Sequence, residues 1–327
     1  MRRLLSAALP LVVASMVAAG CQTSSAATNS RIRIVSTVAP ITDIVRQVVG
    51  DQVDLVGLIP DGVDSHTFEP SPSTVKALAQ ADILFMDGLH LEGSTLAQAK
   101  ANMAKGSKIV SLGDLTVSPD QYAYDFTFPK AQGDPNPHLW MDPTYAIRFS
   151  ELIRDAMVRR DGAHAEVYVA NQRAFATAVT RVDTAVRTAI NTIPANHRKL
   201  LTYHDSFAYF ARRYGLEVIG AVQPSDFSEP SAREITALID QVKATDVPAV
   251  FGSEVFPSTV LRQVASATGA EYVDQLSDDV LPGAPADQNH TYVGLIVTDV
   301  RVMVTALGGD ATALDPVAVG PTWRHRP

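Results

Sequence analysis

The sequence predicts an α/β protein of two lobes, each a mostly parallel sheet flanked by helices, joined by one long rigid helix. Three observations lead to this prediction. Strand-like segments alternate with helical segments in residues 31–160 and again in residues 194–307, and such alternation is typical of parallel sheets with helices on both faces. Between these two series, residues 161–193 contain one long helical pattern.

The N-terminal lobe is expected in residues 31–160, where prolines and capping residues mark the helix ends. Ser71 can cap one helix, and Asp142 followed by Pro143 can start another, because these residues suit the free N–H groups of a first helical turn. We expect strands at 31–38, 53–59, 81–86 and 108–112, and helices at 40–49, 72–80, 91–104 and 143–160. Residues 113–137 read as a long irregular connection, and such loops are often functional.

The linking helix is predicted by apolar residues that recur at three- and four-residue steps, as on one face of an α-helix. These residues are Val167, Ala170, Ala174, Ala178, Val182, Ala185, Val186 and Ala189. A helix of ~30 residues would be ~45 Å long, which exceeds the needs of one small domain. We therefore interpret the helix as a rod that joins the lobes; an ordinary kinked surface helix is the alternative.

The C-terminal lobe is expected in residues 194–307, where the alternation of strands and helices returns. We expect strands at 199–203, 217–222, 249–252 and 271–274, and helices at 206–214, 231–245, 257–268 and 291–307. The two lobes show no sequence repeat. Residues 308–327 form a tail without a clear pattern.

The N-terminus has the order of a secretory signal peptide in residues 1–20: two arginines, an apolar run, then small residues. Cys21 directly follows the small residues, which resembles the lipidation site of bacterial lipoproteins, although Ala18 stands where Leu or Val is commoner. We expect Cys21 to be lipidated and residues 21–30 to be a flexible tether. Simple secretion with cleavage near Ala27 is the alternative. Either way the mature protein is expected outside the cytoplasm, anchored to the cell membrane or periplasmic.

Composition excludes some functions. The 327 residues are 46% hydrophobic and 19% charged, with a net charge of −8, as in ordinary globular proteins. No basic patch stands out, which argues against a nucleic-acid partner. Cys21 is the only cysteine, so a metal site in the mature chain must use His, Asp or Glu.

Four residues are candidate metal ligands: His66, His138, His204 and Asp274. His66 lies in a loop after an expected strand, while His204 and Asp274 lie at the ends of expected strands. The carboxyl ends of parallel strands line the ligand crevice of open sheets, so these side chains can face each other between the lobes. His138 lies in a proline-rich stretch that restricts its backbone.

Three imidazoles and one carboxylate make a four-coordinate site suited to Zn²⁺. Asp278 and Asp279 lie close to Asp274 in the sequence and are the alternatives for the carboxylate ligand. Glu254 also ends an expected strand, and we expect it to accept a hydrogen bond from a ligand histidine rather than to bind the metal.

Four sequence motifs surround the candidate ligands. They are Asp64-Ser-His-Thr-Phe-Glu-Pro-Ser-Pro72, Asn136-Pro-His-Leu-Trp-Met-Asp-Pro143, Thr202-Tyr-His-Asp-Ser-Phe-Ala-Tyr-Phe210 and Tyr272-Val-Asp-Gln-Leu276. Over roughly residues 31 to 307 the chain resembles the metal-binding lipoproteins of bacterial zinc and manganese ABC importers, the cluster A-I solute-binding proteins. The resemblance implies metal binding by His66, His138, His204 and Asp274. It also implies only small hinge motion between the lobes.

The resemblance implies a binding protein and no enzyme: a lipoprotein, expected to be a monomer, that delivers metal to a membrane permease and its ATPase subunit. We expect zinc, because His204 supplies an imidazole where manganese members often have a carboxylate. A manganese or dual-metal protein is the alternative. Zinc members often carry a histidine-rich loop before the second ligand, but residues 113–137 contain no histidine. A zinc hydrolase is less expected, because HExxH is absent and the fourth coordination position has its own protein ligand.

Overall fold

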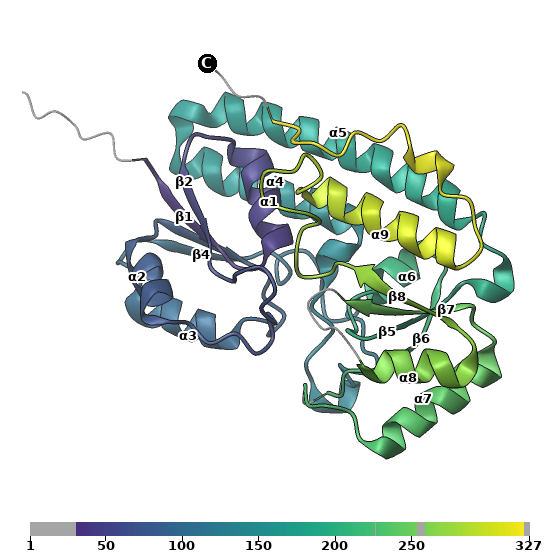
Figure 1. Ribbon diagram of the computed structural model, residues 1–327. Helices are drawn as coiled ribbons and strands as arrows, with labels where there is room; N and C mark the ends of the chain where they lie inside the picture. The colour runs from purple at the N-terminus through teal and green to yellow at the C-terminus, as the bar shows by residue number, and fades with distance from the viewer. Residues whose placement is uncertain (1–30, 226, 254–258, 324–327) are drawn as a thin grey trace, which may run out of the picture. The chain divides into compact units, whose positions relative to one another are not determined.

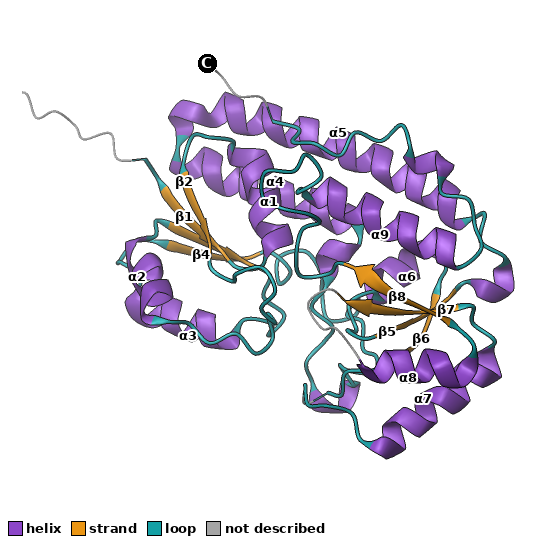
Figure 2. Ribbon diagram, in the orientation of Figure 1, coloured by secondary structure: helices purple, strands orange, loops and turns teal. Residues whose placement is uncertain are grey.

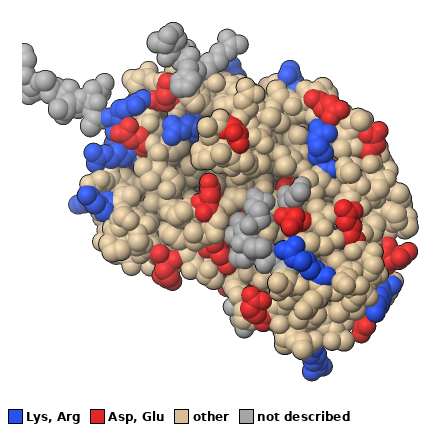
Figure 3. All heavy atoms as spheres, in the orientation of Figure 1, with Lys and Arg blue, Asp and Glu red and all other residues tan. Residues whose placement is uncertain are grey.

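The computed structural model describes residues 31–225, 227–253 and 259–323, and these contain two parallel sheets of four strands each (Figure 1). The expected signal peptide, the tether, Cys21 and Glu254 lie outside the described residues. Within them, no helix combines the length and apolar character that crossing a bilayer requires. On the face in Figure 3, acidic and basic side chains are mixed over the described part of the chain.

The first sheet has the strand order β2-β1-β3-β4, and helices pack on it. Its strands are β1 (Arg33–Ser36), β2 (Asp54–Gly57), β3 (Ile83–Met86) and β4 (Lys108–Ser111). The helices of this lobe are α1 (Ala39–Val49), α2 (Pro72–Gln80), α3 (Gly93–Asn102) and α4 (Pro143–Arg160). All neighbouring strands are parallel, so their carboxyl ends share one edge, from which the loop with His66 leaves.

The second sheet repeats this pattern with the order β6-β5-β7-β8 (Figure 2). Its strands are β5 (Lys199–Thr202), β6 (Glu217–Ala221), β7 (Ala249–Ser253) and β8 (Glu271–Leu276). Its helices are α6 (Ala208–Tyr214), α7 (Ala232–Thr245), α8 (Thr259–Thr268) and α9 (Tyr292–Ala306). Helix α7 begins with a capping box in which Ser231 and Glu234 bond each other's backbone N–H groups.

The long helix α5 (Ala165–Ile190) has 26 residues, which corresponds to about 39 Å. It packs against α1 and α4 of the first lobe and against α9 of the second. Its buried stripe includes Phe175, Val179, Val182 and Val186. The helix is therefore more than a connecting rod, because its apolar side contributes to a core shared by both lobes.

The C-terminal tail is ordered against this core as far as it is described, which its sequence did not predict. Leu314 is buried, in a short helical turn that packs on α5. Farther along, the Thr322 backbone N–H donates to Gln47 Oε1 of α1 at 2.8 Å.

An ion-pair network holds α6 against α5 and the start of α4. The Arg213 guanidinium of α6 contacts both Asp183 oxygens, with Nη2 2.7 Å from Oδ2. It also lies 3.3 Å from Asp142 Oδ1. Asp142 caps α4 through the Thr144 N–H. Since α4 follows the His138 loop directly, this network sets where that loop enters the helix.

Candidate metal centre

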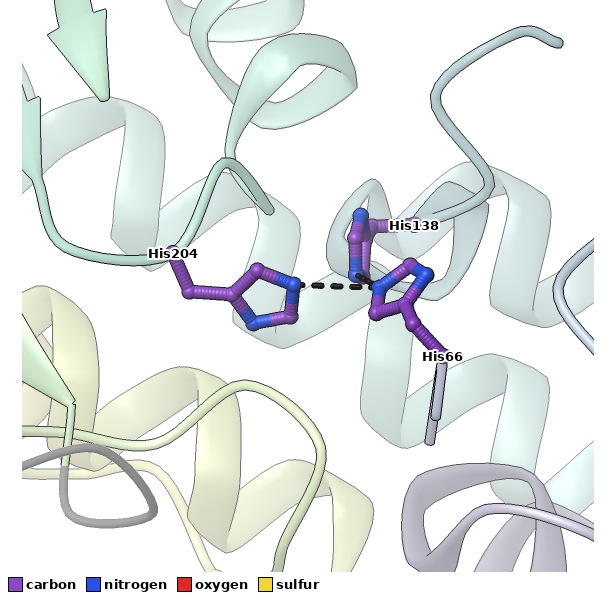
Figure 4. A group of neighbouring side chains, drawn as sticks. All are labelled: His66, His138 and His204. Carbon is purple, nitrogen blue, oxygen red and sulfur yellow. Dashed lines mark hydrogen bonds between the residues drawn. The ribbon is translucent and has the colours of Figure 1, made fainter. Parts of the chain in front are cut away.

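Three histidines from distant parts of the chain meet at one point (Figure 4). His66 comes from the loop between β2 and α2, His138 directly follows the long connection at 113–137, and His204 comes from the segment after β5. His66 Nε2 lies 3.2 Å from His138 Nε2 and 3.1 Å from His204 Nε2. The structure therefore brings together the three imidazoles that the sequence analysis singled out.

His138 and His204 are buried and His66 is partly buried. Burial lowers the pKa of His66 and of His138 well below the usual value, and the neighbouring imidazoles lower both further. Both rings are therefore neutral at pH 7. A neutral imidazole has a free nitrogen lone pair, which metal binding requires.

Asn136 sets the orientation of His138. Its Nδ2 donates to the Asp205 carbonyl at 2.6 Å and to Asp125 Oδ2 at 3.0 Å, so its Oδ1 is the atom that faces His138. This oxygen accepts from the His138 backbone N–H and lies 2.8 Å from His138 Nδ1. His138 Nδ1 must then carry the proton, which leaves the Nε2 lone pair directed at the other histidines.

Asp278 does the same for His204. Its Oδ2 lies 3.0 Å from His204 Nδ1 and also accepts from Ser206 Oγ. Burial would lower the pKa of His204, but the carboxylates of Asp278, Asp279 and Asp64 together outweigh burial and raise that pKa to about 9. Asp278 therefore contacts a candidate ligand histidine, whereas the contact predicted for Glu254 lies outside the described residues. Since Ser206 Oγ donates to Asp278, these contacts do not form a Ser-His-Asp triad.

Asp279 supplies a carboxylate at the histidine cluster. It is 4% exposed, and its Oδ1 lies 3.9 Å from His138 Nε2. Within the described part of the chain this oxygen has no hydrogen-bond partner, whereas Oδ2 accepts from Ser65 Oγ. Burial raises the pKa of Asp279 to about 7. A buried acceptor without a partner is costly, and a cation between it and the imidazoles would satisfy it.

The expected position of Asp274 at this cluster is wrong. Strand β8 continues to Leu276. Asp274 therefore lies inside this edge strand with its side chain facing outward, and it does not mark the end of the strand. Its side chain is 51% exposed and lies 3.7 Å from Arg262. After the true end of β8, the next carboxylates along the chain are those of Asp278 and Asp279.

Aromatic rings surround the histidines, and the sequence motifs did not predict this arrangement. His66 stacks on Phe227 with ring centres 4.7 Å apart and an interplanar angle of 21°. The ring centre of Phe128 lies 5.5 Å from that of His66, and the ring centre of Trp140 lies 5.1 Å from that of His138. These rings make the surroundings of the cluster apolar, which strengthens electrostatic attraction to a bound cation.

Known proteins resemble this chain over most of its length. The family model described as zinc-uptake complex component A, periplasmic (ZnuA), matches residues 34–306. The manganese-binding lipoprotein MntA of Halalkalibacterium halodurans is 25% identical over 301 residues, covering 91% of this chain and 96% of that protein. The zinc-binding protein TroA of Treponema pallidum is 28% identical over 288 residues, covering 86% and 91%.

The solved structures confirm the two-lobe fold with its long helix. Periplasmic TroA of Treponema pallidum superposes with a TM-score of 0.76 at 24% identity, covering 85% of this chain and 99% of that one. A manganese-bound periplasmic metal-binding protein of Candidatus Liberibacter asiaticus gives a TM-score of 0.73 at 25% identity, covering 84% and 98%.

Proposed function

Because the chain belongs to the ZnuA family of periplasmic zinc-uptake components, it is a solute-binding protein of a metal ABC importer, and we propose that its cargo is Zn²⁺. His66, His138, His204 and Asp279 would bind the ion. The observation that supports this proposal most is that the Nε2 atoms of His138 and His204 lie 3.2 and 3.1 Å from His66 Nε2, beside a buried oxygen of Asp279 that has no hydrogen-bond partner among the described residues.

The geometry favours a small tetrahedral ion. Zinc–nitrogen bonds of about 2.0–2.1 Å at tetrahedral angles separate the nitrogens by about 3.3–3.4 Å. The observed separations of 3.2 and 3.1 Å from His66 Nε2 need to widen by only a few tenths of an ångström. A site with three imidazoles also suits zinc better than manganese, which prefers oxygen ligands. Manganese is the alternative, since several relatives, MntA among them, are named for that metal.

As an importer component the chain is a binding protein and not an enzyme, and it works with a membrane permease and an ATPase. Four protein ligands leave no coordination position for an activated water, unlike a catalytic zinc site. We further propose that Cys21 carries a lipid anchor and that the protein is a monomer held outside the cytoplasm. The relative MntA, which is named a lipoprotein, supports the anchor.

Competitive titration of the metal-free protein with Zn²⁺ and Mn²⁺ tests the proposed cargo. We expect zinc to bind at least about 100-fold more tightly, following the general affinity order for nitrogen and oxygen ligands. We expect the His204→Ala variant to lose most of the zinc affinity of the wild type. Equal affinity for both ions would exclude zinc specificity, and binding of neither ion would exclude the metal site itself.

Zinc affinity is also expected to depend on pH in a defined way. The pKa of His204 in the metal-free protein is raised to about 9, so zinc must displace a proton from this ring below that pH. Affinity should therefore fall about tenfold per pH unit as pH decreases from 9 to 7. Below pH 7 the fall should steepen, because the Asp279 carboxyl, with its pKa raised to about 7, also takes up a proton.

Calorimetric titration at pH 8 in buffers of different ionisation enthalpy measures this effect, and about one proton should be released per zinc bound. His66 and His138 should contribute nothing in this range, because their pKa values are well below 6.5. Affinity that is constant from pH 7 to pH 9 would show that His204 is already neutral in the metal-free protein.

A further inference from the structure

The three histidines are held in different ways. Asn136 orients His138 and Asp278 orients His204, each by a polar contact to Nδ1. The ring of His66 instead lies against Phe227, nearly parallel to it, while Phe128 is tilted against His66 and meets Phe227 edge-on. His66 is also the member of the three that is partly exposed. Its orientation therefore depends on ring packing.

Phe227 has an unusual backbone. Its φ of +58° lies in the left-handed region, which bulky residues rarely adopt and which persists only where the surroundings hold it. Here the Phe227 N–H donates to the Pro224 carbonyl at 2.9 Å. This hydrogen bond therefore stabilises the strained backbone conformation, and that conformation places the Phe227 ring against His66.

Two hydrogen bonds join the segment before Phe227, in the C-terminal lobe, to the loop that carries Phe128. Thr127 Oγ1 donates to the Gln223 carbonyl at 2.7 Å, and Gln132 Nε2 donates to Ser225 Oγ at 2.9 Å. His66 belongs to the N-terminal lobe, so the ring that stacks on it comes from the opposite lobe. The stack thus makes the position of His66 depend on contact between the lobes.

We propose that Phe227 is a positioning residue for His66 and thereby sets how slowly the bound metal is lost. This inference rests on the proposed binding of metal by His66. A partly exposed ligand is the one that water or a chelator reaches first. The Phe227 ring covers one face of this imidazole and restricts its rotation, so Nε2 stays directed at the metal. Without the ring, His66 would leave the metal more often.

The test is the rate of zinc release to excess chelator, measured by stopped flow. We expect Phe227→Leu to release zinc about three- to tenfold faster, the effect of losing one ring-stacking contact. Phe227→Tyr, which keeps the stack, should release zinc within about twofold of the wild type. Phe126→Leu is the matched control, because Phe126 is 49% exposed in the same loop as Phe128, and it should behave as wild type.

A second comparison separates the ring from the backbone. Phe227→Gly removes both the ring and the strain at φ +58°, so its metal-free form should melt no lower than that of Phe227→Leu while zinc release stays fast. Wild-type release rates in both variants, with zinc still bound, would overturn the positioning role alone. A wild-type protein that binds no metal would overturn the proposed function, and this inference with it.

Discussion

Asp279→Ala is expected to weaken zinc binding at least about 100-fold, whereas Asp274→Ala is expected to leave it unchanged. Loss of a residue that only orients a metal ligand typically costs 10- to 100-fold in affinity, so loss of a ligand should cost at least the upper end of that range. Asp279 Oδ1 is buried at the cluster. Asp274 is half exposed beside Arg262. Zinc titration against a competing chelator measures both variants.

Two further variants make this comparison sharper. Asp279→Asn keeps the shape of the side chain but removes its charge, so it should bind zinc nearly as weakly as Asp279→Ala. Asp278→Ala removes the contact to His204 Nδ1 and should cost about 10- to 100-fold. If Asp274→Ala lost more affinity than Asp279→Ala, the assignment of the fourth ligand would be reversed.

Trp140→Ala is expected to destabilise the metal-free protein by about 3–5 kcal/mol, the usual cost of removing a large buried aromatic side chain. Trp140 is 0% exposed. Its Nε1 donates to the Asp278 carbonyl at 3.0 Å, which connects the His138 loop to the residue that orients His204. Denaturant unfolding without metal measures the loss, because bound zinc would add stability of its own.

The matched variant Trp140→Phe separates packing from hydrogen bonding. It keeps most of the ring but leaves the Asp278 carbonyl without its donor, which should cost about 1–3 kcal/mol. Phe126→Leu, at an exposed position, should change the free energy of unfolding by less than about 0.5 kcal/mol. If Trp140→Ala lowered the free energy of unfolding by less than about 1 kcal/mol, the stability of the two packed lobes would not depend on this ring.

Local chemistry was sufficient to predict most elements from the sequence. Helices α2 and α4 have the expected bounds, because Ser71 and Asp142 cap them and a proline follows each cap. These signals act over three or four residues and need no tertiary context. The end of β8 could not be predicted this way. A charged residue is tolerated on the open side of an edge strand, so Asp274 looked like a terminus although the strand continues to Leu276.

The sequence by itself determined the two-lobe α/β architecture and three histidines as candidate ligands, because helix and strand periodicity and the position of a residue after a strand are local properties. Only the tertiary structure decided which carboxylate joins the histidines and what orients each ring. Asn136 reaches Asp205 across 69 residues of sequence and Trp140 reaches Asp278 across 138. Such contacts depend on how the lobes pack, which no short stretch of sequence encodes.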